Sequence, residues 1–391
     1  MQGRIGKTPF PFKGKEILAK ALKDIEKGDL VYIFGGEWGF SPINTGVTGL
    51  STNYQHTVSC SSDGSTVACH KSAPYVYKRT GLTTWTPVNL SANPSGTIHG
   101  VALSPSGRYL AFGTDSSPYL FVYEFTGTEY TARSLDSGPG ATVYGVSFIS
   151  DDALAVYFSA SPYICVYTTG TTFTRVDPDI SSGSLGNDKT VMLVISDSMF
   201  TAFTTTSSSY TSYLWSFQNG ILSRVLSIGS YTYVRSAARN NLLNTEFLSP
   251  STSTSPSISL YFSSFTSSTT TYNHGSIPYS IYGAAPTQSG FLLATTGGIL
   301  ALDVLGNYTP TPNFSCYRLG ITSSTCRGFA WNSDYTLYYT SVNGVLTAIE
   351  ATGFPCILPA TFPTLPYTFY LACALEDIPA GGIGSVFLVG K

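Results

Sequence analysis

Eight side chains that can stack on a ligand or hydrogen-bond to it recur along the sequence at intervals of 42 to 49 residues. They are His56, His99, Tyr144, Lys189, Tyr233, Tyr282, Arg327 (or Cys326, one residue earlier) and Phe369. Aromatic rings with a polar edge, mixed with cationic groups, suit the recognition of a sugar or a protein surface. We therefore predict a ring of binding residues; the alternative is that these side chains only fill a channel and the contacts between repeats.

Three further tyrosines, Tyr75, Tyr119 and Tyr163, lie 44 residues apart, and each directly follows a proline. They belong to the segments "KSAPYVYKRTG", "SSPYLFVYEFTG" and "SASPYICVYTTG". Proline favours an extended entry into a strand, and the closing glycine permits a tight hairpin. We expect these tyrosines on the same face as the ring, further from its centre.

The elements that position these residues are predicted by a second repeat, of tight-turn signals. Such turns occur at residues 64, 107, 152, 197, 241, 290, 334 and 377, each flanked by apolar runs of strand length. An interval of about 40–45 residues that holds four short strands is typical of a β-propeller blade. The sequence therefore predicts a single all-β propeller over residues 29–391.

The two ends of this region predict how the ring of blades closes. Residues 29–46 match the outer two strands of a blade, and residues 367–390 match the inner two. Pairing of these half-blades would hide both sheet edges and give eight blades. Seven blades is the alternative if the C-terminal hairpin packs elsewhere.

In period and strand pattern, for example "TIHGVALSPSGRYLAFGT" followed by "LFVYEF", the chain resembles the WD-repeat-like β-propellers from about residue 29 to 391. It departs from that family because the Trp-Asp dipeptide is absent from the third strand of every repeat. The Gly-His pair survives only in reversed order, as His99-Gly100. The resemblance implies a propeller with a scaffold or binding habit.

Residues 1–28 form a separate, basic leader with seven Lys or Arg and three acidic residues. Its segment "GKEILAKALKDIEKG" places Ile17, Leu18 and Leu22 on one stripe of a short amphipathic helix. The preceding residues include Arg4, Lys7, Phe10 and Phe12, which suggest a docking arm that inserts into a neighbouring subunit. The alternative is a cap on the propeller itself.

Composition narrows the class of protein. Charged residues make up 11% of the chain, and the net charge is −2. Outside the leader the sequence has no extended basic face, so we do not expect it to bind nucleic acid. No apolar run of about 18 residues predicts a membrane span. Inward-facing acidic residues for a metal are lacking, and no G-x-S-x-G, HExxH or phosphate-binding glycine loop occurs. The sequence thus predicts no cofactor, no metal and no enzyme.

The combination of low charge, many hydroxyl groups and a basic aromatic leader looks like a virion protein of a tailed bacteriophage, at the tail, collar or capsid surface. Such a protein would be made in the host cytoplasm and assembled in multiple symmetric copies. Its partners would be other virion or assembly proteins, or a host-surface glycan. The alternatives are a cytoplasmic WD-repeat-like interaction scaffold and a propeller hydrolase.

Overall fold

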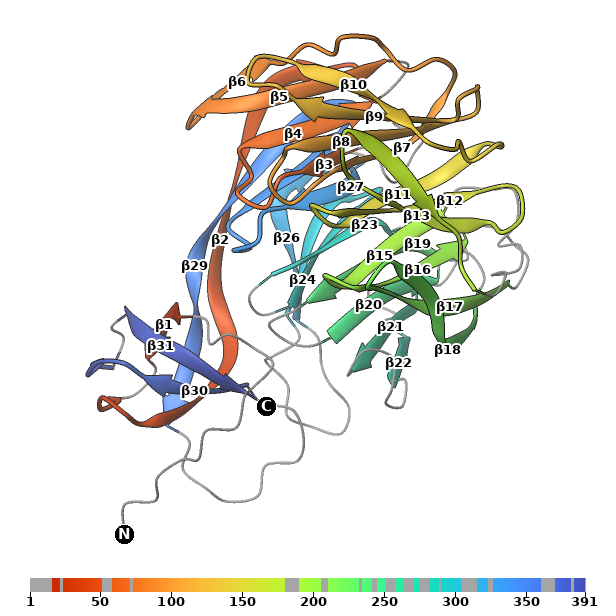
Figure 1. Cartoon of the computed structure of the whole chain (residues 1–391). Helices are drawn as coiled ribbons and strands as arrows, with labels where there is room; N and C mark the ends of the chain where they lie inside the picture. The colour runs from red at the N-terminus through yellow and green to blue at the C-terminus, as the bar shows by residue number, and fades with distance from the viewer. Residues whose placement is uncertain are drawn as a thin grey trace.

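Short antiparallel hairpins recur along the chain in the computed structural model, and consecutive hairpins pair into four-stranded blades (Figure 1). The structure describes residues 16–21, 24–50, 58–70, 73–179, 190–204, 210–231, 234–240, 245–250, 257–262, 270–273, 281–287, 290–303, 315–322, 326–359, 370–380 and 383–390. The regular elements in these ranges are β-strands, which confirms the predicted all-β propeller class.

The first three blades are complete in sequence order, from inner to outer strand. Blade 1 contains β3 (Val58–Cys60), β4 (Thr66–His70), β5 (Pro74–Gly81) and β6 (Thr84–Pro87). Blade 2 contains β7 (Ile98–Leu103), β8 (Tyr109–Thr114), β9 (Leu120–Phe125) and β10 (Tyr130–Leu135). Blade 3 contains β11 (Val143–Ser150), β12 (Ala153–Phe158), β13 (Ile164–Thr168) and β14 (Thr172–Val176).

The next three blades follow the same plan. Blade 4 contains β15 (Thr190–Ser196), β16 (Met199–Thr204), β17 (Tyr210–Gln218) and β18 (Ile221–Tyr231). Blade 5 contains β19 (Val234–Asn240), β20 (Thr245–Pro250), β21 (Ser257–Phe262) and β22 (Thr270–Asn273). Blade 6 contains β23 (Ile281–Pro286), β24 (Gly290–Thr295), β25 (Gly298–Asp303) and β26 (Ser315–Thr322).

Blade 7 joins the two ends of the chain. It contains β27 (Cys326–Trp331), β28 (Leu337–Val342), the first part of β29 (Val345–Pro359) and the last part of β2 (Leu30–Thr48). The N-terminal region therefore supplies one outer strand, not the predicted two. The described strands form seven blades, which was the alternative to the predicted eight. The C-terminal hairpin packs elsewhere and adds no blade.

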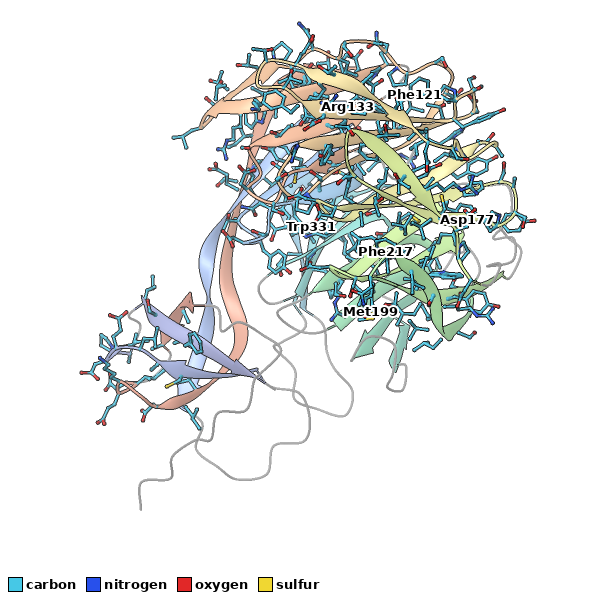
Figure 2. The ribbon with its side chains drawn as sticks, viewed as in Figure 1. Phe121, Arg133, Asp177, Met199, Phe217 and Trp331 are labelled. Atoms are coloured by element: carbon cyan, nitrogen blue, oxygen red, sulfur yellow. The ribbon has the colours of Figure 1, made fainter. Side chains whose placement is uncertain are left out.

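The second strand of a blade is covered on both faces, which explains its continuous apolar sequence. Every residue of β8 and of β12 is buried, as is every residue of β24. The outer strand β10 instead alternates, with its solvent-facing positions exposed. Side chains from adjacent blades fill the space between them, as the sticks in Figure 2 show.

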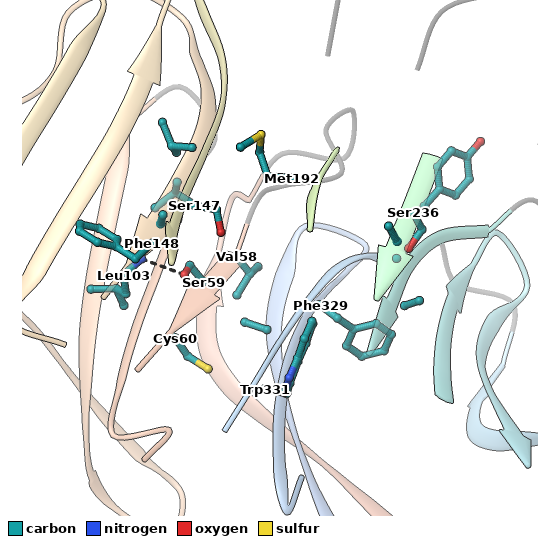
Figure 3. A pocket seen from close by; sticks show the side chains of 18 residues that line it. Val58, Ser59, Cys60, Leu103, Ser147, Phe148, Met192, Ser236, Phe329 and Trp331 are labelled. Atoms are coloured by element: carbon teal, nitrogen blue, oxygen red, sulfur yellow. Dashed lines mark hydrogen bonds between the residues drawn. The ribbon is translucent and has the colours of Figure 1, made fainter. Parts of the chain in front are cut away.

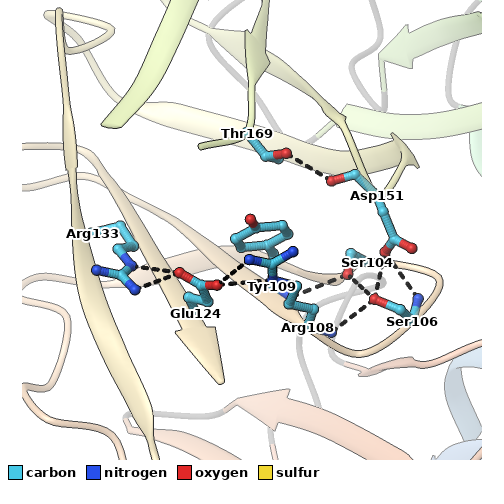
Figure 4. A network of polar contacts seen from close by, with 8 residues as sticks. All are labelled: Ser104, Ser106, Arg108, Tyr109, Glu124, Arg133, Asp151 and Thr169. Atoms are coloured by element: carbon cyan, nitrogen blue, oxygen red, sulfur yellow. Dashed lines mark hydrogen bonds and ion pairs between the residues drawn. The ribbon is translucent and has the colours of Figure 1, made fainter. Parts of the chain in front are cut away.

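Hydrogen bonds between the first turns of neighbouring blades hold one end of the propeller together. The Ser333 backbone N–H donates to the Ser62 carbonyl at 2.6 Å, and the Ser62 N–H donates to the Pro105 carbonyl at 2.7 Å. The Ser106 N–H and hydroxyl donate to the Asp151 carboxylate at 3.0 and 2.7 Å (Figure 4). These contacts link blade 7 to blade 1, blade 1 to blade 2, and blade 2 to blade 3.

The C-terminal hairpin belongs to a small closed sheet, which we call the terminal barrel. It consists of β1 (Glu16–Ala21), β31 (Ile383–Gly390), β30 (Tyr370–Ala374) and the outlying ends of β2 and β29. Each strand pairs with the next in that order, and β29 pairs back to β1 in parallel, so five strands close on themselves. Small and branched side chains, among them Ala19, Val31 and Val386, fill its interior.

The predicted helix in the leader is wrong. Residues 16–21 form strand β1, and the backbone of Glu16–Lys20 pairs with β31. Ala19 and Ala21 are both fully buried, which is the two-residue period of a strand. An isolated helix of three turns has little stability of its own. Pairing with the open edge of β31 therefore overrides the helix propensity of this segment. Of the other leader residues, Ile17 and Leu18 lie on β1, whereas Arg4, Lys7, Phe10, Phe12 and Leu22 lie outside the described residues.

The terminal barrel and the propeller are connected by a two-stranded ribbon. Residues 36–40 of β2 pair with residues 351–355 of β29, between the two larger bodies (Figure 1). The same two strands thus run from the barrel through the ribbon into blade 7. In the described part of the chain, no helix is long and apolar enough to cross a membrane.

Candidate functional site

The first strands of the blades surround an axial channel, and we call the end at which these strands begin the mouth. In blade 7, Cys326 pairs with Val342, which pairs with Val345, so these residues lie at the mouth end. Leu337 pairs with Glu350 at the opposite end, where β29 leaves for the ribbon. The mouth therefore faces away from the terminal barrel.

Four residues of the predicted ring are described: His99, Tyr144, Tyr282 and Arg327. They lie at or near the starts of the first strands of blades 2, 3, 6 and 7. The other predicted members, His56, Lys189, Tyr233 and Phe369, lie outside the described residues. The strand that follows Phe369 is β30 of the terminal barrel, so the count of one residue per blade gives a ring of seven.

His99 and Tyr144 form an aromatic pair across the contact of blades 2 and 3. Their ring centroids are 5.2 Å apart, and His99 Nε2 lies 3.8 Å from Asp115 Oδ2. Burial opposes ionisation of Asp115, but hydrogen bonds from Thr97 and the nearby imidazole lower the pKa of that carboxyl below its ordinary value. An imidazole beside a carboxylate and a phenol can bind a polar ligand or transfer a proton.

Arg327 and Tyr282 form the corresponding pair across blades 6 and 7. The guanidinium carbon of Arg327 lies 3.9 Å from the centroid of the Tyr282 ring, a cation–π contact. Both side chains are half-buried. Between Arg327 and Cys326, the two candidates for this position, Cys326 is fully buried, so the mouth residue is Arg327.

The three tyrosines that follow proline are less exposed than expected for an outer binding surface. Tyr119 and Tyr163 occupy the turns between the second and third strands of blades 2 and 3, with φ of 67° at each. Tyr75 lies inside strand β5. All three side chains are partly buried and pack against core clusters, so packing already accounts for much of their surface. Their role in binding stays a prediction.

Below the mouth, residues from all seven first strands line a cavity of about 200 Å³ (Figure 3). A second cavity of about 300 Å³ extends toward the ribbon side and shares Cys60, Ser147, Met192 and Trp331 with it. These channel residues were not among the predicted site residues. The sequence feature that could have identified them is the alternation in "CRGFAW". Arg327, Phe329 and Trp331 occupy every second position of this strand and are partly exposed. Among the described residues, no group of three His, Cys, Asp or Glu side chains is placed to hold a metal ion.

No family model and no curated protein matches the chain. Solved structures share its fold. Virginiamycin B lyase from Staphylococcus aureus has a TM-score of 0.54 at 10% identity, over 80% of this chain and 99% of that one. A catalytically inactive variant of that lyase with quinupristin gives a TM-score of 0.55 at 11% identity, over 80% of this chain and 99% of that one. Hydrazine synthase from Kuenenia stuttgartiensis gives 0.56 at 12% identity, over 76% of this chain and 95% of that one.

These likenesses confirm the propeller fold, and they correct one prediction. The absence of hydrolase and metal motifs from the sequence led to the prediction that the protein is not an enzyme. That prediction is contradicted, since the lyase and the synthase that share the fold are both enzymes. Motif absence failed as an argument because a fold fixes the scaffold while the reaction depends on individual side chains. At 10–12% identity the likeness assigns neither of their reactions to this chain.

Proposed function

We propose that this protein is the recognition subunit of a larger assembly, held by its terminal barrel and binding a protein or glycan surface with the propeller mouth. The observation that carries the proposal is the strand register of blade 7. It puts Arg327 at one end of the propeller and the exit of β2 and β29 at the other. A molecule anchored through its barrel therefore presents its mouth outward.

The side chains at the mouth support contact with a polar surface. Tyrosine offers a flat apolar face and a hydroxyl at low cost in conformational entropy, and it is enriched in binding surfaces. Tyr144 and Tyr282 are each paired with a cationic or ionisable side chain. Such pairs can stack on a sugar ring and hydrogen-bond to its hydroxyl groups.

The assembly that composition favours is a bacteriophage virion with several copies of the protein. In this proposal, residues 1–15, with Arg4, Lys7, Phe10 and Phe12, dock into a neighbouring subunit. They precede Glu16, whose backbone pairs with Phe387 at the surface of the terminal barrel. Ile383 and Phe387 are 51% and 40% exposed there and offer an apolar contact beside the arm.

The test separates the two ends of the molecule. We would measure binding of the intact protein to a glycan array and its co-migration with large particles from its source. Tyr144→Ala and Tyr282→Ala are expected to reduce array binding at least about tenfold, as for aromatic anchors of an interface. Removal of residues 1–15 is expected to abolish co-migration and leave array binding intact.

Leu82→Ser is the matched control, because Leu82 is 78% exposed in a hairpin of blade 1 away from the mouth. If the mouth variants bind as well as Leu82→Ser, the mouth is not the recognition surface. If the shortened protein still joins the particles, the N-terminal segment is not the docking element.

A second candidate is an enzyme that acts at the same mouth. The arrangement of His99, Asp115 and Tyr144 favours it, because an imidazole and carboxylate 3.8 Å apart can move a proton to or from a bound substrate. Quinupristin, the compound bound by the lyase variant, is the first substrate to try, with product analysis by mass spectrometry. Turnover that His99→Ala abolishes would support this candidate.

A further inference from the structure

The cavity of about 200 Å³ below the mouth adjoins the proposed recognition surface. Tyr282, a residue of the mouth, is also part of the cavity wall. A molecule that contacts the mouth can therefore extend one group into the channel. The cavity has room for roughly seven water molecules at about 30 Å³ each. A single pyranose ring with its hydroxyl groups fills a comparable volume.

The backbone of the first strands supplies polar groups to the wall of this cavity. In the described sheets, each of the seven first strands pairs with a neighbouring strand on one side only. All seven line the cavity, so their other edges border the channel. The edge of a strand presents a row of backbone N–H donors and C=O acceptors. The wall is therefore polar without being charged, and the blades hold its polar groups in place.

Serine side chains add hydroxyl groups to this wall. Ser59, Ser147 and Ser236 come from blades 1, 3 and 5. The Leu103 backbone N–H donates to Ser59 Oγ at 2.9 Å (Figure 3), and the Ser59 hydroxyl keeps its own hydrogen to donate to another acceptor. Ser147 is partly exposed and lies across the channel from Trp331 in Figure 3. A ligand rich in hydroxyl groups therefore meets both donors and acceptors.

One side of the cavity offers aromatic surface. Phe329 and Trp331 of blade 7 and Tyr282 of blade 6 belong to its wall, and all three side chains are partly exposed. Aromatic rings with a few well-placed polar groups are typical of sites that bind small molecules. The apolar C–H face of a sugar can pack on these rings while its hydroxyl groups reach the serines and strand edges.

The wall of this cavity is neutral. None of the described residues that line it carries a charge. Burial, with the nearby Asp63 second, raises the pKa of the Cys60 thiol far above its ordinary value, so this thiol stays protonated. An ionised group that entered the cavity would lose its hydration without gaining an ion pair, which costs free energy. The cavity therefore favours a neutral sugar over an acidic one.

We propose that this cavity binds a neutral hexose, the terminal sugar of a glycan that reaches the mouth. The inference rests on the proposed function, because its ligand is the glycan that the mouth recognises. The terminal sugar packs against the aromatic side of the cavity and hydrogen-bonds to Ser147 and to the strand edges. Since the first strands of all seven blades surround the cavity, a glycan enters it from the mouth with its end first.

The experiment uses the intact protein on a glycan array that holds each neutral glycan beside its counterpart capped with sialic acid. The glycans that bind are expected to end in a neutral hexose. The acidic cap is expected to weaken binding at least about tenfold, because the cavity has no charged group to pair with it. Ser147→Phe fills the channel and is expected to weaken binding of the uncapped glycans by a similar factor. Ser227→Phe is the matched control, since Ser227 is exposed on the outer strand of blade 4.

The outcomes distinguish this inference from the proposed function. If Tyr144→Ala loses array binding and Ser147→Phe keeps it, the mouth binds glycans from outside and the cavity inference is overturned. It is also overturned if capped and uncapped glycans bind equally, or if the wild type binds no glycan. If Ser147→Phe loses binding and Tyr144→Ala binds as well as Leu82→Ser, the cavity inference holds and the mouth is not the recognition surface. Should Ser147→Phe not fold, the capped and uncapped glycans on the wild type decide the matter.

Discussion

The propeller and the terminal barrel are both closed β structures, but different kinds of strand pairing close them. Blades 1 to 6 are made of hairpins between consecutive strands. The barrel instead pairs β1 with β31, and Ile25 with Ile378, across almost the whole length of the chain. Local pairs lose little loop entropy on forming, whereas pairs of the two ends form only after the ring has brought those ends together.

This difference explains why the two bodies share strands. β2 and β29 each contribute to blade 7 at one end and to the terminal barrel at the other. Closure of the ring places these strands side by side, and the barrel then forms on their free ends. The propeller should therefore be stable without the barrel, and the barrel should not form without the propeller.

The largest expected effect on stability comes from truncating the chain at either end, which removes strands that close the barrel or the propeller. A chain ending at residue 359 lacks β30 and β31 but keeps all four strands of blade 7. We expect it to lose the barrel and to keep the main thermal transition of the propeller in calorimetry. A chain that starts at residue 49 lacks β2, opens blade 7 at its outer edge and should aggregate or unfold.

The same pair of truncations tests the number of blades. If the C-terminal hairpin were part of an eighth blade, deletion of residues 360–391 would open the ring and lower the main transition as much as deletion of residues 1–48. Size-exclusion chromatography distinguishes the outcomes, because an open ring exposes a strand edge and self-associates.

A smaller effect is expected from adding one methyl group at the close backbone contacts of each body. A Cβ on Gly113 would lie 2.5 Å from Val143 Cγ1 and 3.0 Å from the Val143 carbonyl oxygen, at the contact of blades 2 and 3. Because a backbone atom is involved, Gly113→Ala should destabilise the propeller by about 2 kcal/mol. Chemical unfolding measures this cost.

Gly384→Ala is the counterpart in the terminal barrel. Its Cβ would meet Ile378 Cγ1 at 2.6 Å, Ile378 Cδ1 at 2.8 Å and Glu376 Oε1 at 3.0 Å, which are side-chain atoms and include no backbone atom. We expect a cost of about 1 kcal/mol, confined to the barrel. Equal effects of the two substitutions on the main transition would show that propeller and barrel unfold as one unit.

The contrast also explains what could be predicted from the sequence. The blades repeat, and each turn sequence, such as Ser106-Gly107, determines the structure of residues next to it. The period of the repeat, the all-β class and the starts of the inner strands could therefore be predicted from local sequence patterns. The terminal barrel has no repeat. Its strand β1 has the apolar stripe of a helix, and pairing with β31 and β29, both far away in the sequence, makes it a strand.

The candidate sites divide in the same way. His99, Tyr144, Tyr282 and Arg327 were found by counting back from the turns, because each blade places its first strand alike. Asp115 was missed because it lies in a loop, and its contact with His99 arises from the fold of that loop. The channel residues, Trp331 among them, were missed because the fold brings them together from different blades.

The smallest expected effect concerns the hydrogen bonds that join blade 2 to blade 3. Burial opposes ionisation of Asp151, but hydrogen bonds from the Ser106 backbone and side chain, with smaller contributions from Ser104 and Arg108, lower the pKa of its carboxyl below the ordinary 3.8. A carboxyl whose pKa is lowered by folding stabilises the folded state above its unfolded pKa, and this contribution is lost as the pH falls through the lower, folded pKa. Since Asp151 is partly exposed, Asp151→Asn should cost about 0.5 kcal/mol at pH 7 and less at pH 3.

Urea unfolding of the wild type and Asp151→Asn at both pH values measures this difference. Asp152→Asn is the matched control, because Asp152 is exposed and adjacent in the chain. A cost of Asp151→Asn that is the same at pH 3 as at pH 7 would mean that the charge of Asp151 does not strengthen the contact. The bond to Ser106 would then act only as a neutral hydrogen bond, and the blades would be held together at this turn by packing.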